Sequence, residues 1–473
     1  MSIRNLLKSE TCLNTIKGAY TPEQFGVFLN MYSFETTDNY QVVFHENYHY
    51  WQSVFTPFGQ SKWMVARNTS TSILELWKEA TNQDPTSRVI PITAMIPCKT
   101  MKQLGAIAKI HMQIFAQQVC NVAERATGNR DLEEITHVSV DELCPEIQVD
   151  GNKYKLNGID IIEGYAKFQE AILVNIIESK PFEEIIDPAV LKPEYYMALF
   201  YFISRVGTDR IHEFPAVCEM ALMGSSMCII DNHKYWENQY PAWRFVKIID
   251  VISKYNPSEY LGSNLEKDYI HYLEHTLKTC GYVSHEDCWE ETISYISKEK
   301  TTITSDISNA IEFKLKYPWV LSYPFYNLDL MIEMKRFHPY YYIMSNESRY
   351  TVDSFEAYNE VTLENHYQAF AHQICGYPSA RCTDYRKIQC GFSYYGIQEC
   401  KYQLDGTCDG HIDKDSVLPI AKLDDEENIV DGCMFELFLK LMDISIKDLN
   451  ITNVNSRLTW AQISENNKIL KNK

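Results

Sequence analysis

The sequence predicts a mainly α-helical protein with a small β-hairpin, an α+β architecture. Apolar residues recur with helical periodicity through much of residues 1–255 and again through 263–315. The clearest β signal lies within 135–156, where the dipeptide Asp150-Gly151 is typical of a tight hairpin turn. The chain has 473 residues, of which 45% are hydrophobic, so it can bury a substantial core in more than one folding unit.

The elements can be placed in order along the chain. We expect a short strand or turn at 25–34, a helix around 42–51, strands at 135–140 and 146–156, and a helix that starts near Asn157. The remaining helices are expected at 61–80, 99–125, 194–206, 216–230, 242–255, 263–282 and 288–315. The hairpin either offers an edge strand to an extended peptide or only braces two helices.

The segment Asn256-Pro257-Ser258 is a boundary signal, and the composition changes again near residue 371. We therefore expect a first domain at 1–255, a helical region at 256–370 and a Cys-rich C-terminal region at 371–473.

The predicted helix at 42–51 contains an HExxH motif, formed by His45, Glu46 and His49. On a helix this spacing places two imidazoles one turn apart on one face, where they can bind one zinc ion. Glu46 is then the general base that takes a proton from metal-bound water. The other residues of 42–51 are uncharged, as a helix buried behind an active site requires. The alternative is an internal helix whose histidines only form hydrogen bonds.

A catalytic zinc site needs a third protein ligand and a fourth position for water. The best candidate is Glu163, which lies among apolar residues that follow a helical stripe, at positions 159, 162, 166 and 173. A carboxylate in such a stripe is costly to bury alone, and binding a cation offsets that cost.

The two segments together resemble the paired motifs of gluzincin metallopeptidases, in which HExxH is followed by a glutamate in an EGxA-like helix. The resemblance implies a zincin-like catalytic core in residues 1–255. It also implies that His45, His49 and Glu163 bind zinc and that Glu46 is the base. The resemblance covers only these two segments. More than a hundred residues separate them, and Ile162 stands where the family has Asn.

A second pattern, His271-Tyr272-Leu273-Glu274-His275, matches the inverted motif HxxEH, which zinc peptidases also use. Its neighbours are those of a solvated helix face, on which His271 and His275 would be ordinary exposed residues. It remains the competing metal site.

Zinc hydrolases commonly add a Tyr, His or Arg donor that stabilises the oxyanion of the transition state. The sequence offers several such residues without distinguishing among them, and for each a packing role is the alternative. They are Tyr195, Tyr196, Tyr201, Tyr240, His212 and His233, and Arg244 is a candidate substrate anchor or structural anchor.

The chain has 14 cysteines, and in a large chain without a leader most are expected to be reduced. Five are expected in or beside helices as core residues: Cys98, Cys120, Cys218, Cys228 and Cys280. A C-terminal cluster contains Cys375, Cys382, Cys390, Cys400 and Cys408. We expect either a second, structural metal site there, zinc or iron-sulfur with Cys382, Cys390, Cys400 and Cys408, or thiols that pack or respond to oxidation. No CxxC pair is present.

The formal net charge of −19 argues against attraction to nucleic acid or an anionic membrane, because both favour positive surfaces. No run of eighteen apolar residues is present, and residues 1–8 lack the apolar stretch of a secretory signal. Cytoplasmic residence is the resulting expectation.

These observations together predict a zinc-dependent metallopeptidase that acts on a protein or peptide substrate, with one catalytic zinc ion. A regulatory partner is compatible with an intracellular protease, but no residue indicates one. Two alternatives stay open: an interaction protein whose zinc site is structural or a relic, and a zinc hydrolase that acts on a non-peptide amide or ester.

Overall fold

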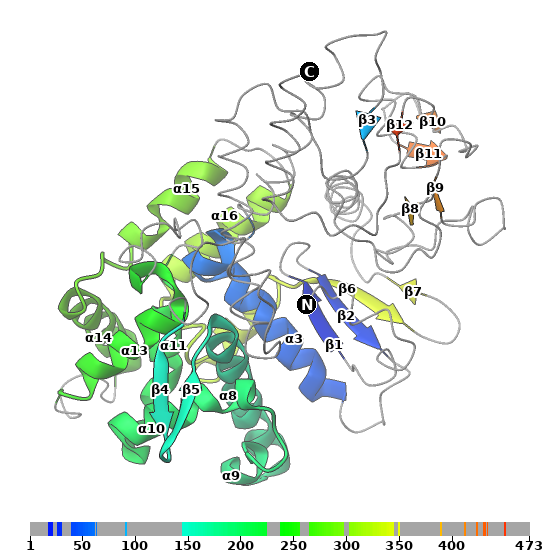
Figure 1. The fold of residues 1–473 in the computed structure, drawn as a ribbon. Helices are drawn as coiled ribbons and strands as arrows, with labels where there is room; N and C mark the ends of the chain where they lie inside the picture. The colour runs from blue at the N-terminus through cyan, green and yellow to red at the C-terminus, as the bar shows by residue number, and fades with distance from the viewer. Residues whose placement is uncertain are drawn as a thin grey trace, which may run out of the picture.

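A computed structural model describes the parts of the chain on which the candidate site depends. The described residues are 18–21, 26–30, 39–61, 63, 90–91, 144–224, 237–255, 264–297, 302–344, 349–350, 388–389, 411–412, 422–423, 429–431, 433 and 449–450. Most of them are helical, so the fold is mainly α with a smaller β component, and this part of the sequence-based prediction is confirmed (Figure 1).

Two long helices lie side by side, α3 (Asn39–Val54) and α8 (Gly158–Glu178). The other described helical segments follow α8 in the sequence: α9 (Phe182–Ile185), η3 (Pro193–Tyr195), α10 (Met197–Val206), η4 (Thr208–Glu213), α11 (Phe214–Ala221), α13 (Pro241–Ile252), α14 (Leu265–Thr279), η6 (Asp287–Trp289), α15 (Glu290–Ile296), α16 (Thr302–Lys316) and α17 (Leu328–Met334). α8 contacts α10, α11 and α13 as well as α3, so it is surrounded by helices and carries many buried residues.

A four-stranded sheet covers the other side of α3 (Figure 1). Its strands are β1 (Gly18–Thr21), β2 (Gly26–Asn30), β6 (Tyr340–Met344) and β7 (Arg349–Tyr350), in the order β1-β2-β6-β7. β2 pairs with β6 in parallel, and the other two pairs are antiparallel. β1 and β2 both contact α3, so this helix lies between the sheet and α8.

The predicted hairpin is present. β4 (Glu146–Val149) and β5 (Asn152–Lys155) pair in antiparallel fashion, and the turn residues Asp150 and Gly151 have φ values of 49° and 80°. Asn, Asp and Gly tolerate this left-handed region, which the tight turn requires. β4 contacts α10, and this contact agrees with a bracing role. Three further short pairs join β3 (Ile90–Pro91) to β12 (Leu449–Asn450), β8 (Ile388–Gln389) to β9 (His411–Ile412), and β10 (Lys422–Leu423) to β11 (Ile429–Asp431).

Helix α8 begins with a capping box. The Asn157 side chain accepts hydrogen bonds from the backbone N–H groups of Ile159 and Asp160, and Asp160 accepts one from the Asn157 N–H at 2.7 Å. These contacts satisfy backbone donors that would otherwise lack helical partners. The start predicted near Asn157 is therefore confirmed, and it fixes which residues of α8 face α3.

Leu321 and Ser322, which follow α16 in the sequence, form hydrogen bonds with both long helices. Tyr48 of α3 donates to the carbonyl of Leu321 at 2.7 Å. From α8, Tyr165 shares a hydrogen bond with the Ser322 hydroxyl at 3.1 Å, and Gln169 donates to the Ser322 carbonyl at 2.9 Å. These contacts connect α3 and α8 to the same two residues, and they help to fix the position of one helix relative to the other.

A buried ion pair supports the same segment. Lys314 of α16 lies 2.5 Å from Glu219 of α11, and neither residue is exposed. Ser322 donates to the second oxygen of Glu219 at 2.8 Å, and Lys314 also donates to the Pro318 carbonyl. Both charges are thus compensated by partners, which buried charges require.

Several predicted elements differ from those observed. The helix expected at 288–315 is divided into η6, α15 and α16, and the helix expected at 216–230 ends at Ala221. The expected segments 61–80, 99–125 and 135–140 lie wholly or almost wholly outside the described residues, as does the boundary at 256–258.

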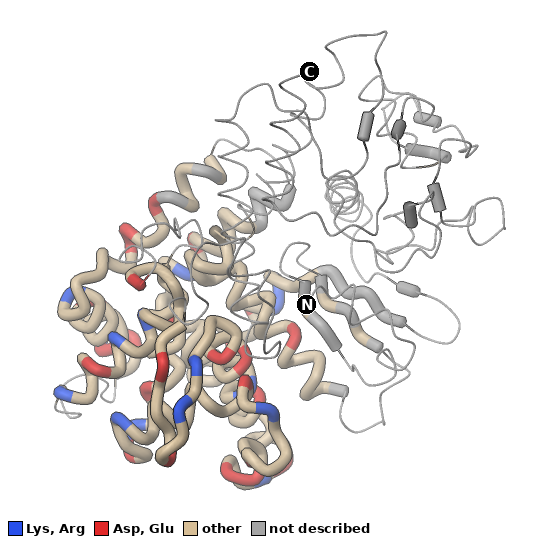
Figure 2. Tube along the Cα trace, viewed as in Figure 1, with Lys and Arg blue, Asp and Glu red and all other residues tan. Residues whose placement is uncertain are grey.

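Among the described residues, no helix combines the length and apolar character needed to cross a membrane. Acidic and basic residues are interspersed along the described helices (Figure 2).

Candidate metal centre

Helix α3 presents His45 and His49 on one face, as the motif predicts. The two residues are 8% and 7% exposed, and their Nε2 atoms lie 3.1 Å apart. Both rings therefore point to one position beside the helix.

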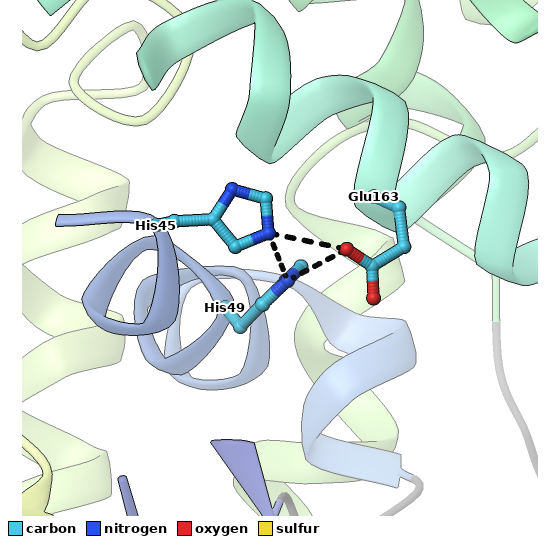
Figure 3. A group of neighbouring side chains, drawn as sticks. All are labelled: His45, His49 and Glu163. Atoms are coloured by element: carbon cyan, nitrogen blue, oxygen red, sulfur yellow. Dashed lines mark hydrogen bonds and ion pairs between the residues drawn. The ribbon is translucent and has the colours of Figure 1, made fainter. Parts of the chain in front are cut away.

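Helix α8 brings Glu163 to that same position (Figure 3). Its Oε2 atom lies 3.1 Å from Nε2 of His45 and 3.2 Å from Nε2 of His49. The Glu163 side chain is 20% exposed, whereas those of the two histidines are 10% and 8% exposed. The third residue thus comes from the predicted helix, and the group keeps some contact with solvent.

The geometry of the three atoms fits a metal ion. Bonds of about 2.0–2.1 Å to a tetrahedral zinc ion separate neighbouring ligand atoms by about 3.3 Å. The observed separations of 3.1–3.2 Å form a triangle of nearly that size. Among the described residues, His45, His49 and Glu163 make up the one His/Cys/Asp/Glu group with this arrangement. Three ligands leave the fourth tetrahedral position free for water or substrate.

The electrostatics of the group favour a cation at its centre. Burial lowers the pKa of His45, but hydrogen bonds to Glu163 and Glu170 outweigh burial and raise the pKa to about 10. Burial raises the pKa of Glu163, yet the charge of His49 and hydrogen bonds from both imidazoles hold that pKa well below its usual range. Both shifts show that the site stabilises positive charge, which a proton or a metal ion can supply.

Glu46, the predicted base, is 9% exposed on α3. Burial raises its pKa, as do the carboxylates of Glu163 and Glu170, whereas the charges of His45 and His49 lower it. The net effect is a raised pKa, and a carboxylate with a raised pKa is a better proton acceptor near neutral pH.

One of the predicted oxyanion donors lies at the site. Tyr195, at the end of η3, packs edge-on against the His45 ring with 5.9 Å between ring centroids. The charge of Glu163, burial and the charge of Glu46 raise the pKa of the Tyr195 hydroxyl, so it stays protonated and can donate.

The other described candidates have structural contacts. Tyr240 accepts a hydrogen bond from the Gly158 N–H, and Arg244 donates to the carbonyls of Met220 and Asn238. Tyr196 packs against Phe200. Tyr201 is buried, whereas His212 is exposed. His233 lies outside the described residues.

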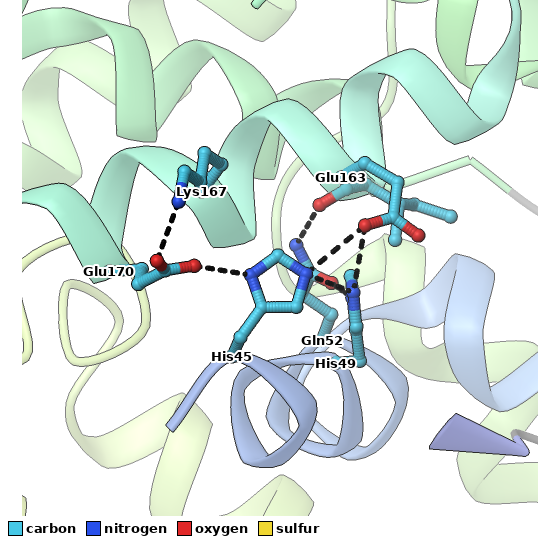
Figure 4. Close-up of polar contacts among 7 residues, drawn as sticks. His45, His49, Gln52, Glu163, Lys167 and Glu170 are labelled. Atoms are coloured by element: carbon cyan, nitrogen blue, oxygen red, sulfur yellow. Dashed lines mark hydrogen bonds and ion pairs between the residues drawn. The ribbon is translucent and has the colours of Figure 1, made fainter. Parts of the chain in front are cut away.

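Three polar residues around the imidazoles were not predicted from the sequence: Gln52, Lys167 and Glu170 (Figure 4). Nδ1 of His45 lies 3.0 Å from Glu170, and Nδ1 of His49 lies 2.8 Å from Gln52. Their spacing was a usable signal, because Gln52 follows His49 by three positions and Glu170 follows Glu163 by seven.

The inverted motif on α14 does not form a comparable group. His271 is exposed, the His275 ring packs against Tyr255, and Glu274 accepts a hydrogen bond from the His285 N–H at 2.9 Å. Among the described residues, this motif gives no cluster with the spacing of metal ligands.

The predicted cysteine sites are described only in part. Cys218 and Cys280 are 0% and 3% exposed and free, as expected of core residues. Cys98, Cys120 and Cys228 lie outside the described residues, and so does the cluster of Cys375, Cys382, Cys390, Cys400 and Cys408.

Comparison with known proteins gives no relative for this site: no family model, curated protein or solved structure matches the chain.

Proposed function

We propose that the protein is a zinc-dependent metallopeptidase with a zincin-like core of the gluzincin type. The observation that carries this proposal is the triangle of Nε2 of His45, Nε2 of His49 and Oε2 of Glu163, with sides of 3.1–3.2 Å. Two imidazoles and one carboxylate are the donor set of many catalytic zinc sites. Glu163 lies more than a hundred positions after the two histidines, and the three side chains still converge at one point.

The neighbouring residues have the properties that hydrolysis requires. A bound zinc ion supplies a Lewis acid that polarises a carbonyl group and makes water acidic near neutral pH. Glu46 accepts the proton that the attacking water loses and passes it to the leaving amine. The Tyr195 hydroxyl donates to the oxygen on which negative charge develops.

The sheet beside α3 favours a peptide as the substrate. β1 is the end strand in the order β1-β2-β6-β7, so one of its edges has no partner strand among the described residues. Tyr20 of β1 stacks on the His49 ring with 6.5 Å between centroids, which places this strand next to the metal-binding group. An extended peptide can pair with such an edge through its backbone.

The test is digestion of a peptide library by the zinc-loaded protein, with the products identified by mass spectrometry and the metal-free protein as control. We expect cleavage that depends on zinc. A zinc-loaded protein that cleaves no peptide would contradict the proposal. In that case, hydrolysis of an amide or ester panel would indicate a non-peptide substrate, and inactivity on both would favour a structural metal site.

Substitution Tyr195→Phe removes the proposed oxyanion donor and keeps the ring that packs on His45. We expect kcat to fall by about 10²–10³-fold, because one preorganised donor contributes that much to transition-state stabilisation. Steady-state kinetics on a cleaved peptide measures the change, and zinc content is expected to stay the same. Tyr196→Phe is the matched control, since Tyr196 packs against Phe200. Equal activity of both variants would exclude Tyr195 from catalysis.

A further inference from the structure

We infer that Gln52 is a positioning residue that keeps His49 and Glu163 in the relative position needed to bind one metal ion. In the same way, Glu170, held by Lys167, positions His45. This inference rests on the metal site of the proposed function and on no step of hydrolysis. It can therefore be tested by metal binding alone.

The contacts of Gln52 fix the protonation pattern of His49. An imidazole that binds a metal through Nε2 carries its proton on Nδ1, and the acceptor at Nδ1 sets the plane of the ring. Nδ1 of His49 lies 2.8 Å from Oε1 of Gln52. The amide cannot turn over, because its nitrogen donates to the Ile162 carbonyl at 2.9 Å. Gln52 is therefore the acceptor, and the Nε2 lone pair of His49 points to the metal position.

The same amide joins the two helices that carry the ligands (Figure 4). Gln52 lies on α3, and its partner Ile162 directly precedes Glu163 on α8. One side chain thus ties the ring of one ligand to the backbone beside another. Gln52 is 3% exposed, so water competes little for either hydrogen bond.

Glu170 has the equivalent role for His45, with a charged acceptor. Its Oε2 atom lies 3.0 Å from Nδ1 of His45, and its Oε1 atom accepts from Lys167 at 2.6 Å. Glu163, Lys167 and Glu170 occupy positions i, i+4 and i+7 of α8, so they share the face that meets α3. The side chains of Lys167 and Glu170 are only 14% and 8% exposed. The lysine therefore keeps the carboxylate directed at the imidazole.

The experiment measures Co²⁺ affinity by competition with a chromophoric chelator, together with the visible spectrum of the bound ion. Gln52→Met keeps the length of the side chain and removes both hydrogen bonds. Glu170→Gln keeps the shape and removes the charge. We expect Gln52→Met to bind Co²⁺ about 10–100-fold more weakly than the wild type, as is usual when the outer partner of a ligating histidine is lost. Glu170→Gln keeps an acceptor for His45 and loses only its charge, so we expect a smaller loss of affinity in the same direction. The spectrum is expected to change because the rings lose their fixed orientation.

Matched controls come from the same two helices. Gln41 of α3 also donates to α8, to Glu178 at 3.2 Å, but at the opposite end of α8 from Glu163. Gln41→Met and Glu178→Gln are expected to leave both the affinity and the spectrum unchanged. Gln52→Glu restores the acceptor for His49 and is expected to recover part of the lost affinity.

The possible failures are distinguishable. A wild-type protein that binds no Co²⁺ would overturn the proposed function and the inference together. Wild-type affinity and spectrum in Gln52→Met and Glu170→Gln would overturn the inference and leave the metal site standing. Circular dichroism of the metal-free proteins checks folding. If Gln52→Met is unfolded, Gln52→Glu replaces it, because it removes the hydrogen bond to Ile162; wild-type affinity and spectrum in both Gln52→Glu and Glu170→Gln would still overturn the inference.

Discussion

Glu46→Gln is expected to lower kcat by about 10²–10⁴-fold, the contribution of a general acid–base residue. The amide has nearly the shape of the carboxylate but accepts no proton. His45, His49 and Glu163 are unchanged in this variant, so zinc is expected to remain bound. Single-turnover kinetics on a cleaved peptide, together with zinc analysis of the same samples, measures both outcomes.

The result separates a chemical role of Glu46 from a structural one. The buried carboxyl already has a raised pKa, so its neutral replacement is not expected to destabilise the fold. An active Glu46→Gln protein would remove the proposed mechanism. Loss of zinc in this variant would show that Glu46 helps to hold the metal, and would require a different base.

Lys314→Met is expected to lower the free energy of unfolding by about 3–5 kcal/mol, the usual cost of removing one partner of a buried ion pair. Glu219 would be left charged and fully buried, with Ser322 still donating to one of its oxygens. Ser322 also forms hydrogen bonds with Tyr165 and Gln169 of α8. We therefore expect the position of α8, which carries Glu163, to be less well fixed in this variant. Urea denaturation of the metal-free proteins measures the loss of stability.

Two controls make this prediction specific. Lys316→Met changes an exposed residue at the end of the same helix and is expected to alter stability by less than about 0.5 kcal/mol. Adding Glu219→Gln to Lys314→Met removes the uncompensated charge and is expected to recover part of the loss. A Lys314→Met protein as stable as the wild type would show that the ion pair does not stabilise the fold.

The metal-binding group was predictable because each half of it is encoded locally. The HExxH spacing places His45 and His49 on one face of any helix, and Glu163 stood out as a carboxylate in an apolar stripe. Their convergence was a prediction that only the packing of α3 on α8 could test. Gln52 and Glu170 were not recognised, because polar residues are common on helices and their partners lie on another element.

The four-stranded sheet, unlike the metal-binding group, could not be predicted from local sequence patterns. β2 falls inside the expected segment 25–34, but its partner β6 lies more than three hundred residues later in a Tyr-rich stretch. Parallel pairing of such distant segments leaves no local pattern that could identify the partner. The division of residues 288–315 into separate helices was missed for a related reason, since one apolar periodicity continues through the break.

The most direct test of the metal centre is the zinc content of the wild-type protein and of Glu163→Gln, measured by mass spectrometry of the metal after dialysis. We predict that the substitution removes one zinc ion per chain, because an amide is a far poorer zinc ligand than a carboxylate. Glu178→Gln, on the same helix, is expected to retain the wild-type content. Equal zinc in the wild type and Glu163→Gln would contradict a site built from His45, His49 and Glu163.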